Sequence, residues 1–484
     1  MALSLSGWGQ DGKAVLTAIK SGDLILLKAY LDSGVDPNLK DDDRSLLNWA
    51  IRFDQGRAAR LLIEYGAEVN ETDDKLNTPL INAAGLNNKE LCKILVDRGA
   101  DPLHKNKKGR LASDFAYNYG TSPAYKYLVS MEKLCAKRDT MASMQDGPYI
   151  YRENSEQVVM AYFDHDRERK LTGIIEKTIR HTEGDTMVQG FGWDTKNYYI
   201  SCRYAPDSCH LVTSGNIFTV GDIHGKFHQM LSLLINNGII DPEQNWTFGN
   251  GRLILLGDVF DRGGSVTETL WFLHRLQRQA RESGGNVHLL LGNHEMMALT
   301  RDYRYLNDKY DFFTKYFQLD YSQLFERNTV LGSWLRSQNV ILRINDYLFS
   351  HAGISSEFAA FNYSDQAVND SVRAYLNSDY IIEKESARDR ILGEFGPQWY
   401  RGYGAYGNEM EATQEFVDEY LAEKNLKKMI IGHNEMSTIT AAFNGKVISA
   451  DVVIDESGKS SQGLLINGDE LFRCYADGRK EKIE

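Results

Sequence analysis

Apolar and polar residues alternate with a helical period over the first quarter of the chain, and this pattern repeats. Each apolar stretch ends at a glycine, Gly34, Gly66 and Gly99 in turn, and these glycines are 32 and 33 residues apart. A glycine directly after a helix supplies a left-handed C-cap, and the Asp, Pro and Asn residues that come next turn the chain back. The spacing predicts helix–helix–turn units over residues 10–130 that stack as an all-α solenoid, because each unit buries its apolar face only against its neighbour.

The repeat period and two short strings resemble those of ankyrin repeats. The strings are Thr78-Pro79-Leu80 and Gly99-Ala100-Asp101-Pro102. The resemblance implies a surface that binds a protein partner, either another protein or the rest of this chain. A scaffold that only stabilises the C-terminal part of the chain is the alternative, and the sequence does not choose between the two.

Two shorter segments separate this array from the second half of the chain. Residues 131–146 are polar and poor in periodicity, which predicts a linker. Residues 147–210 contain short runs of β-branched and aromatic residues, such as residues 158–163, and these runs predict a small β-rich extension. Neither segment contains candidate chemistry.

Residues 211–484 contain apolar runs of β type, each followed by a glycine-rich polar string. The runs cover residues 216–220, 253–256 and 287–291, and helical patterns lie between them at 227–234 and 267–279. Alternation of strand, loop and helix predicts an α/β fold. The polar strings then lie at the carboxyl ends of strands, where α/β folds place their functional sites.

Three polar strings and two single histidines come directly after these and similar runs. The strings are Gly221-Asp222-Ile223-His224-Gly225, Gly257-Asp258-Val259-Phe260-Asp261-Arg262-Gly263 and Gly292-Asn293-His294-Glu295. His351 and His433 each follow a further apolar run, at residues 347–350 and 429–432. Two aspartates, one asparagine and three histidines are thus expected at strand ends. Hard oxygen donors mixed with imidazole suit Mn, Fe or Zn ions rather than a thiolate site.

Composition and charge narrow the class of protein. The chain has 484 residues, of which 42% are apolar and 25% charged, so it is long enough for several folded domains and unlike a disordered chain. Its net charge of 55 − 67 = −12 argues against a nucleic-acid partner. No apolar run approaches the roughly 18 residues that span a bilayer, so no membrane association is expected. Five scattered cysteines and an N-terminus without a signal-peptide pattern predict a reducing, cytoplasmic location.

The polar strings resemble those of the metal-dependent phosphoprotein phosphatases, within the calcineurin-like metallophosphoesterases. The motifs Asp-x-His, Gly-Asp-x-x-Asp-Arg-Gly and Gly-Asn-His-Glu occur in the family's order, and the resemblance covers about residues 214–475. Three further strings are similar to those of the Shewanella-like branch: Ser350-His351-Ala352-Gly353, Pro397-Gln398-Trp399-Tyr400-Arg401-Gly402 and Asp146-Gly147-Pro148-Tyr149. The implied fold is an α/β metallophosphoesterase sandwich, with two sheets flanked by helices, after the ankyrin-repeat solenoid.

The resemblance implies a site for two divalent metal ions, Mn, Fe or Zn, with Mn favoured. The implied ligands are Asp222 and His224 for the first ion, Asp258 as a bridge between the two, and Asn293, His351 and His433 for the second. Two such ions can share a water, lower its pKa and orient it as hydroxide for in-line attack on phosphorus. The last motif reads Gly432-His433-Asn434-Glu435, without the second histidine of many broader metallophosphoesterases, which fits the phosphoprotein branch.

Four further residues are implied in substrate binding and catalysis. Arg262 and Arg401 would hold the phosphoryl oxygens, because a guanidinium fork matches their geometry and charge. His294 would protonate the leaving oxygen, and Asp261 would orient this histidine by accepting its other ring proton. No covalent phosphoenzyme is needed.

The implied function is hydrolysis of phosphomonoesters, with phosphoproteins (Ser/Thr or Tyr) as the favoured substrates. A hydrolase of small phosphorylated molecules, such as dinucleoside polyphosphates, is the alternative. Relatives of that kind often lack the aspartate before the arginine, so Asp261 favours phosphoproteins. A third hypothesis is a binding scaffold whose phosphatase half is inactive, and the presence of all six implied ligands argues against it.

Overall fold

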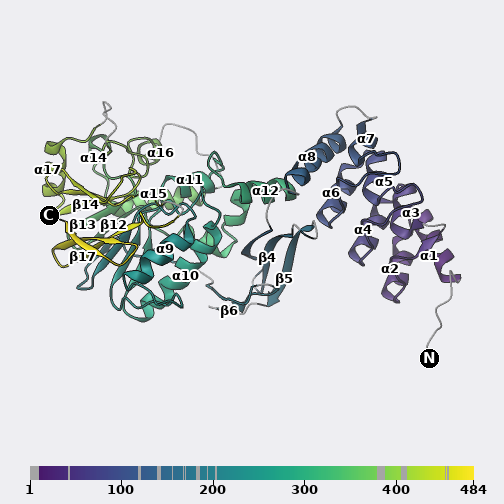
Figure 1. The fold of residues 1–484 in the computed structure, drawn as a ribbon, viewed down its shortest axis with the longest axis horizontal. Coiled ribbons are helices and arrows are strands. Elements are labelled where there is room, and N and C mark those ends of the chain that lie inside the picture. Colours follow the sequence, from purple (N-terminus) through teal and green to yellow (C-terminus); the bar gives the residue numbers. More distant parts are fainter. Residues whose placement is uncertain are drawn as a thin grey trace. The chain divides into compact units, whose positions relative to one another are not determined.

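Two compact units make up the chain in the computed structural model (Figure 1). The structure describes residues 10–484 except 42–43, 118–121, 139–142, 155, 167, 169–170, 181–185, 193, 202–203, 379–386, 405–410, 453, 455–456 and 484. One unit comprises residues 1–146, 162–175 and 315–318, and the other comprises 147–161, 176–314 and 319–484.

Paired helices stack along the first unit (Figure 1). They are α1 (Gln10–Ser21), α2 (Leu24–Asp32), α3 (Leu46–Arg52), α4 (Gly56–Glu64), α5 (Pro79–Gly85), α6 (Lys89–Asp97), α7 (Ala112–Ala116) and α8 (Pro123–Arg138), with a short pair of strands, β1 (Lys40–Asp41) and β2 (Arg44–Ser45). Gly34, Gly66 and Gly99 follow α2, α4 and α6 with φ of 93°, 90° and 90°. These angles confirm the predicted left-handed caps.

Asparagines in the turns join successive repeats. The side-chain oxygen of Asn38 accepts a hydrogen bond from the backbone N–H of Glu68 (2.7 Å), and that of Asn70 accepts one from Asp101 (2.8 Å). The side-chain amide of Asn70 also donates to the carbonyl of Gly99 (2.7 Å). Because these bonds recur at the repeat spacing, each unit is held to its neighbour in the same way, as a solenoid requires.

The predicted linker at residues 131–146 is wrong for most of its length. Helix α8 continues to Arg138, and strand β3 begins at Met144. Residues 139–142 lie outside the described part of the chain. The buried residues of α8 include Tyr127, Leu128, Met131 and Cys135. Their spacing is helical, but they stand among many polar residues, so the apolar stripe of this amphipathic helix is hard to detect in the sequence.

Short strands occupy much of the segment in which a β-rich extension was expected. β3 (Met144–Arg152), β4 (Gln157–Asp166) and β5 (Leu171–Arg180) form a three-stranded sheet, and β6 (Thr186–Gln189) pairs antiparallel with β7 (Asn197–Ile200). The run at residues 158–163 is fully buried within β4. Burial of six successive residues explains why this run has no polar alternation.

Two six-stranded sheets form the centre of the second unit. Their orders are β11-β10-β9-β17-β18-β19 and β15-β16-β14-β13-β12-β8. The strands are β8 (His210–Leu211), β9 (Ile217–Val220), β10 (Arg252–Leu255), β11 (Asn286–Leu289), β12 (Ile341–Ile344), β13 (Tyr347–Ser350), β14 (Lys428–Ile431), β15 (Thr440–Ala442), β16 (Val447–Ser449), β17 (Gln462–Asn467), β18 (Glu470–Tyr475) and β19 (Lys480–Ile483). Residues of both sheets, among them Ile254, Leu342, Ile430 and Leu464, form one buried core.

Helices flank the two sheets (Figure 1). The helices of the chain from residue 227 onward are α9 (Phe227–Asn236), α10 (Val266–Glu282), α11 (Asn293–Leu299), α12 (Asp308–Phe317), α13 (Val330–Leu335), α14 (Ser356–Ala359), α15 (Asp365–Leu376), α16 (Ala387–Leu392) and α17 (Gln414–Glu423), with the 3₁₀-helix η2 (Tyr321–Phe325); α12 is divided between the two units. α10 packs against β11, and α15 packs against β12. The expected α/β sandwich is confirmed. None of the helices in the described ranges combines the length and the apolar character that a bilayer crossing needs.

The strand directions bring the polar strings to one region. β9, β10 and β11 run parallel, and so do β13, β14 and β16 in the other sheet. Parallel strands end at the same edge of a sheet, so the loops that follow them lie close together. The three polar strings follow β9, β10 and β11, and His351 and His433 follow β13 and β14.

Candidate active site

The loops after five strands converge at one place in the second unit. The predicted residues in contact there are Asp222, His224, Asp258, Asp261, Asn293, His294, His351 and His433, and Arg262 and Arg401 line the same cavity of about 130 Å³. The structure therefore brings together every residue that the sequence placed in the site. Their geometry shows what this arrangement can do chemically.

Backbone carbonyls fix the orientation of three histidines. The pairs are Nδ1 of His224 with the carbonyl of Phe260 (2.9 Å), Nδ1 of His351 with that of Leu256 (2.8 Å) and Nε2 of His433 with that of Trp399 (3.2 Å). A carbonyl oxygen can only accept, so each of these ring nitrogens donates. In the neutral ring, the other nitrogen then presents a lone pair.

The lone pairs of these rings meet further acceptors. Nε2 of His351 lies 2.9 Å from Oδ1 of Asn293, 3.1 Å from Nδ1 of His433 and 3.4 Å from Oδ2 of Asp258. Nε2 of His224 lies 3.9 Å from the same Asp258 oxygen. Acceptors at such distances repel one another unless a proton or a metal cation lies among them. This set of oxygen and imidazole donors therefore fits divalent metal ions.

The buried carboxylates of Asp222 and Asp258 also favour positive charge at this place. Burial lowers the pKa of His351, but the carboxylates of Asp258 and Asp222 outweigh it and raise this pKa to about 10. Burial, with the carboxylates of Asp451 and Asp258, raises the pKa of Asp222 well above its usual range. Burial also opposes ionisation of Asp258, yet His351 beside it holds the pKa of Asp258 well below its ordinary value. A divalent cation would satisfy these carboxylates in place of a proton.

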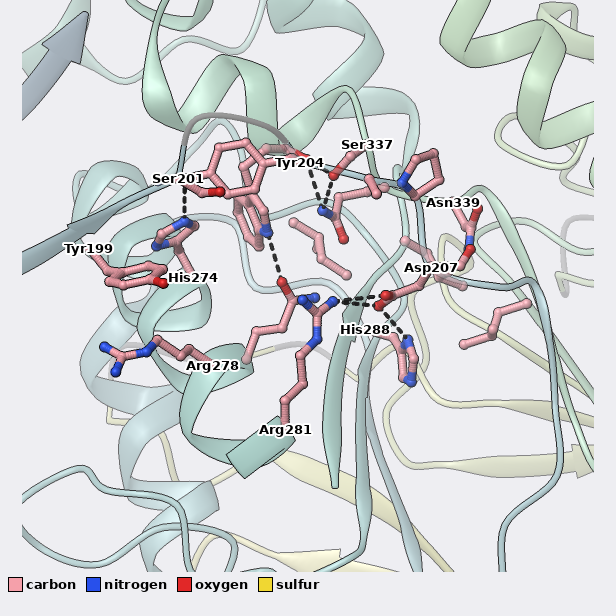
Figure 2. A pocket seen from close by; sticks show the side chains of 18 of the residues that line it. Tyr199, Ser201, Tyr204, Asp207, His274, Arg278, Arg281, His288, Ser337 and Asn339 are labelled. Carbon is pink, nitrogen blue, oxygen red and sulfur yellow. Dashed lines mark hydrogen bonds and ion pairs between the residues drawn. The ribbon is translucent and has the colours of Figure 1, made fainter. Parts of the chain in front are cut away.

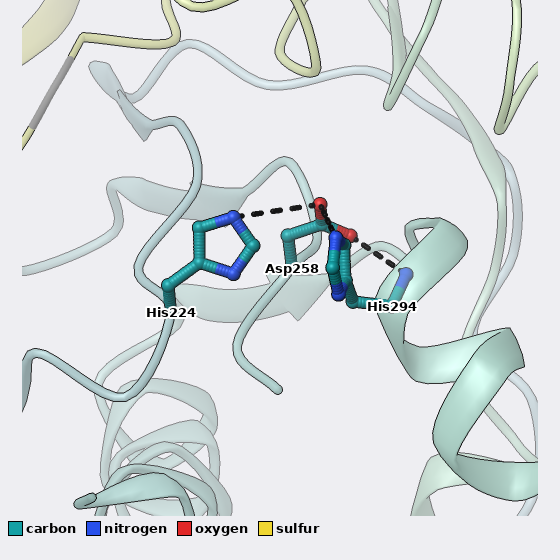
Figure 3. A group of neighbouring side chains, drawn as sticks. All are labelled: His224, Asp258 and His294. Carbon is teal, nitrogen blue, oxygen red and sulfur yellow. Dashed lines mark hydrogen bonds and ion pairs between the residues drawn. The ribbon is translucent and has the colours of Figure 1, made fainter. Parts of the chain in front are cut away.

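Two groups of possible metal ligands share Asp258. One is His224, Asp258 and His294, and the other is Asp258, His351 and His433, with the donor atoms of each group within 4.8 Å of one another. Figure 3 shows Asp258 between His224 and His294. A carboxylate common to both groups is the arrangement that a bridging ligand requires. The first group contains His294 in addition to predicted ligands, so the role of His294 has to be decided on other contacts.

A carboxylate, rather than a carbonyl, orients His294. Its Nδ1 lies 2.6 Å from Oδ2 of Asp261, and both side chains are buried. Its Nε2 lies 3.8 Å from Oδ2 of Asp258. The contact with Asp261 fixes the orientation of the ring, so Nε2 is the nitrogen that faces Asp258 and the cavity. His294 is therefore suited to hold and release a proton at Nε2.

Strained backbone accompanies the site residues. His224, Asp258, Asp261, Arg262 and His433 all have positive φ, between 47° and 67°. Residues other than glycine rarely adopt such angles, and they keep them only where surrounding contacts enforce them. The fold therefore gives up some stability to hold these five side chains in place.

Glu295 ties two of the polar strings together. Its buried carboxylate accepts hydrogen bonds from the backbone N–H groups of Asp258 (2.8 Å), Val259 (2.7 Å), Phe260 (3.2 Å) and Gly292 (2.8 Å). It thus fixes the backbone just past β10 and β11. The string Gly-Asn-His-Glu contains Glu295, but its role cannot be deduced from the string, because its contacts lie up to 37 residues away in the chain.

Replacing Glu295 with glutamine is expected to lower the free energy of unfolding by about 2–4 kcal/mol, because charge-assisted bonds are lost and a buried N–H is left without an acceptor. The metal content of protein loaded with Mn²⁺ should fall with it. Thermal unfolding and elemental analysis measure the two effects. Glu282→Gln, at an exposed position of α10, is the matched control. A Glu295→Gln protein with the wild-type Tm and metal content would contradict the role assigned to this carboxylate.

Three charged residues that were not predicted for the site, Lys226, Glu435 and Asp451, also line the cavity. Burial, with the carboxylate of Asp258, raises the pKa of Asp451 to about 6 against the opposing effect of His351. Asp451 lies just past β16, so the signal that identified the other carboxylates was present here too. The ammonium of Lys226 donates to the carbonyl of Ile454.

A larger cavity of about 430 Å³ lies elsewhere in the second unit (Figure 2). Arg281 donates there to both oxygens of Asp207 (2.8 Å each), and His274 is hydrogen-bonded to the hydroxyl of Tyr204 (2.8 Å). None of the residues predicted for the site lines this cavity. The candidate chemistry therefore belongs to the smaller cavity.

Comparison with known families identifies the class of protein. Residues 215–434 match the calcineurin-like phosphoesterase family, and residues 15–137 match ankyrin repeats in three copies. A cold-active protein-tyrosine phosphatase of a psychrophilic Shewanella species superposes with a TM-score of 0.62 at 32% identity, over 70% of this chain and 100% of that chain. The chain therefore belongs to the calcineurin-like phosphoesterases and is a phosphatase of that family with N-terminal ankyrin repeats.

Its relatives place it more narrowly. An uncharacterized protein of Schizosaccharomyces pombe is 30% identical over 269 residues, which cover 51% of this chain and 76% of that relative. Shewanella-like protein phosphatase 2 of Arabidopsis thaliana is 24% identical over 293 residues, 49% of this chain and 70% of the relative. The resemblance to the Shewanella-like branch is confirmed. The ankyrin match also extends beyond the predicted end at residue 130, in agreement with helix α8.

Proposed function

We propose that this chain is a two-metal phosphatase that hydrolyses phosphomonoesters of phosphoproteins. The observation that supports this function best is the carboxylate of Asp258, which belongs to both groups of possible ligands. Two divalent ions, with Mn favoured over Fe and Zn, would supply Lewis acidity and an activated water there.

The contacts of the site residues support a division of roles. The proposed ligands are Asp222, His224 and Asp258 for one ion, and Asp258, Asn293, His351 and His433 for the other. The three ligand histidines each donate to a backbone carbonyl, which leaves a neutral ring with a lone pair for a metal. His294 instead pairs with Asp261, so we assign it to proton transfer.

Two arginines line the cavity beside these ligands and would bind the phosphoryl oxygens. Nη1 of Arg401 donates to the carbonyl of His433 (3.3 Å), which anchors this guanidinium beside the cluster. The backbone of Arg262 has φ of 59°, next to Asp261 in the same loop. Two guanidinium groups can neutralise the phosphoryl oxygens and orient phosphorus for attack, and His294 can then deliver its Nε2 proton to the departing oxygen.

Three observations favour phosphoproteins as substrates. Asp261 occupies the position that many small-molecule hydrolases of this family leave without an aspartate. The relatives include proteins named as Shewanella-like protein phosphatases, and a solved neighbour is named as a protein-tyrosine phosphatase. The ankyrin array supplies a surface of the kind that binds proteins. A dinucleoside polyphosphate hydrolase is the second candidate, because a bis(5'-nucleosyl)-tetraphosphatase of Vibrio campbellii is 29% identical over 28% of this chain.

A direct comparison of substrates tests this proposal. With Mn²⁺ bound, we expect kcat/KM on phosphopeptides to exceed that on a dinucleoside tetraphosphate by on the order of 10²-fold, because a site shaped for one leaving group discriminates by such factors. Phosphate release measures the first reaction and chromatography of nucleotides the second. The reverse order of kcat/KM would favour the small-molecule hydrolase. No turnover of either substrate, or of para-nitrophenyl phosphate, would indicate an inactive scaffold.

A further inference from the structure

Two neighbouring turns of the ankyrin array, at residues 73–77 and 106–110, have the same hydrogen-bonded structure. In the first, Oδ1 of Asp73 accepts hydrogen bonds from the backbone N–H groups two and four residues later (2.9 Å each). In the second, one repeat period later, Oδ1 of Asn106 does the same at 3.0 and 3.1 Å. The side-chain amide of Asn106 also donates to Oδ1 of Asn77 (2.9 Å). The two turns are therefore held in one conformation and joined to each other.

The 73–77 turn carries a strained and exposed leucine. Leu76 has φ of 56°, whereas the equivalent position of the 106–110 turn is Gly109, with φ of 71°. Glycine adopts this left-handed conformation readily, but a side chain disfavours it. Leu76 is also 41% exposed. This leucine therefore contributes little to the turn or to the core of the array, and a strained residue of this kind is expected at a binding surface.

Exposed cations accompany Leu76 in both turns. They are Lys75, Lys105, Lys107, Lys108 and Arg110. The backbone N–H of Lys107 donates to the carbonyl of Lys75 (3.0 Å), which keeps the two groups of cations together. No acidic residue occurs between residues 102 and 113, and none of the five cations forms an ion pair with any residue that the structure describes. A surface with unpaired charge of one sign favours a partner of the opposite sign.

Acidic groups of the same repeat do not neutralise these cations. Asp73 is buried, and its carboxylate accepts the hydrogen bonds of its own turn. Glu71 forms an ion pair with Lys40 in β1, and Asp74 lies 3.9 Å from Arg44 in β2. The carboxylates of Glu71 and Asp74 thus interact with the preceding strands, and the positive charge of the two turns remains available to a partner.

We infer that the 73–77 and 106–110 turns form a docking surface for an acidic peptide segment that contains an apolar residue, and that this segment belongs to the phosphoprotein substrate. Carboxylates of the segment would pair with the lysines and with Arg110, and the apolar side chain would pack on Leu76. The inference rests on the proposed function for the identity of the partner. Because docking is separate from the chemistry, it should lower KM for such substrates and leave kcat unchanged.

Binding of a fluorescent, unphosphorylated peptide to the full chain tests this surface without any catalysis. The probe carries glutamates on both sides of one leucine, and the same peptide with glutamines is its control. We expect Lys107→Glu combined with Lys108→Glu to weaken binding about tenfold, because attractive contacts become repulsive. Arg57→Glu combined with Arg60→Glu makes the same charge change at exposed positions of α4 and should change the affinity less than about twofold.

Replacing Leu76 with glycine separates binding from folding. Leu76→Gly should weaken binding of the glutamate peptide about fivefold, because the apolar contact is lost. Its Tm should stay at or above the wild-type value, since glycine relieves the strained backbone. A Leu76→Gly protein that binds the peptide as tightly as the wild type would overturn the inference.

Enzyme kinetics connect the surface to the substrate. A phosphopeptide joined to the acidic segment by a series of flexible linkers should have a lower KM than the phosphopeptide alone. The variant with Lys107→Glu and Lys108→Glu should lose this difference, with kcat and the activity on para-nitrophenyl phosphate unchanged. An acidic segment that lowers KM at no linker length would overturn its assignment to the substrate.

The remaining outcomes distinguish the docking surface from the proposed function. Equal affinities of the two double variants, or of the glutamate and glutamine peptides, would overturn the docking surface. Tighter binding of a single-stranded RNA than of the glutamate peptide would overturn it in favour of a nucleic-acid partner. If the wild-type protein loaded with Mn²⁺ binds the glutamate peptide but releases phosphate from no phosphopeptide, the proposed function fails and the assignment of the segment to a substrate fails with it.

Discussion

The Asp258→Asn protein is expected to fold, to bind less metal and to lose activity on para-nitrophenyl phosphate by on the order of 10³-fold. Asp258 is 2% exposed and belongs to both groups of possible ligands. Its Oδ1 accepts from the backbone N–H of His294 (3.0 Å), and its Oδ2 lies 3.4 Å from Nε2 of His351. An asparagine keeps one oxygen but replaces the other with an NH₂ group, which cannot bind a metal ion. Elemental analysis beside initial rates measures both effects.

A matched substitution shows whether the loss is specific. Asp207→Asn changes the same chemical group in the larger cavity, where it breaks an ion pair with Arg281 and touches none of the proposed ligands. This control should keep the wild-type metal content and activity. Equal metal content and equal rates in Asp258→Asn and the wild type would contradict the bridging role and, with it, the two-metal site.

The convergence of the predicted residues could be expected from the sequence because the signal for it is local. Each predicted ligand stands within a few residues of the end of an apolar strand, as Asp222 follows β9 and His433 follows β14. In a parallel sheet such positions must come together, so strand-end position and residue type sufficed to select them. The ankyrin array could also be predicted from the sequence, because the glycines that cap its helices, Gly34, Gly66 and Gly99, recur at nearly constant spacing.

The features that the sequence could not supply depend on long-range contacts. The carbonyls of Phe260, Leu256 and Trp399 decide which nitrogen of each histidine faces the cluster, and no motif contains those pairings. The role of Glu295 could not be predicted for the same reason, because most of its hydrogen bonds go to backbone N–H groups 35 to 37 residues away in the chain. The linker error has a different origin. Helix α8 buries only a narrow stripe, and its many polar residues resemble those of an unstructured segment.

His294 decides between the two interpretations of the first ligand group. His294→Gln is expected to lower kcat/KM on a phosphoserine peptide by on the order of 10³-fold, within the range for loss of a general acid. The loss on para-nitrophenyl phosphate should be about tenfold or less, because nitrophenolate departs without a proton. Metal content should stay at the wild-type value, since the proposed ligands are untouched. Asp261→Asn, which weakens the partner of Nδ1, should show the same substrate dependence with smaller losses.

The pattern of losses distinguishes a proton donor from a ligand. A metal ligand contributes to the hydrolysis of every substrate through the bound metal. Its removal would therefore lower the rates on both substrates by the same factor, and it would also lower the metal content of the protein. Equal losses with reduced metal in His294→Gln would move this histidine into the metal site, alongside His224 and Asp258. Unequal losses with full metal would place it where Asp261 orients it, with Nε2 available to the leaving oxygen. The contact with a carboxylate rather than a carbonyl is the physical reason to expect the second result.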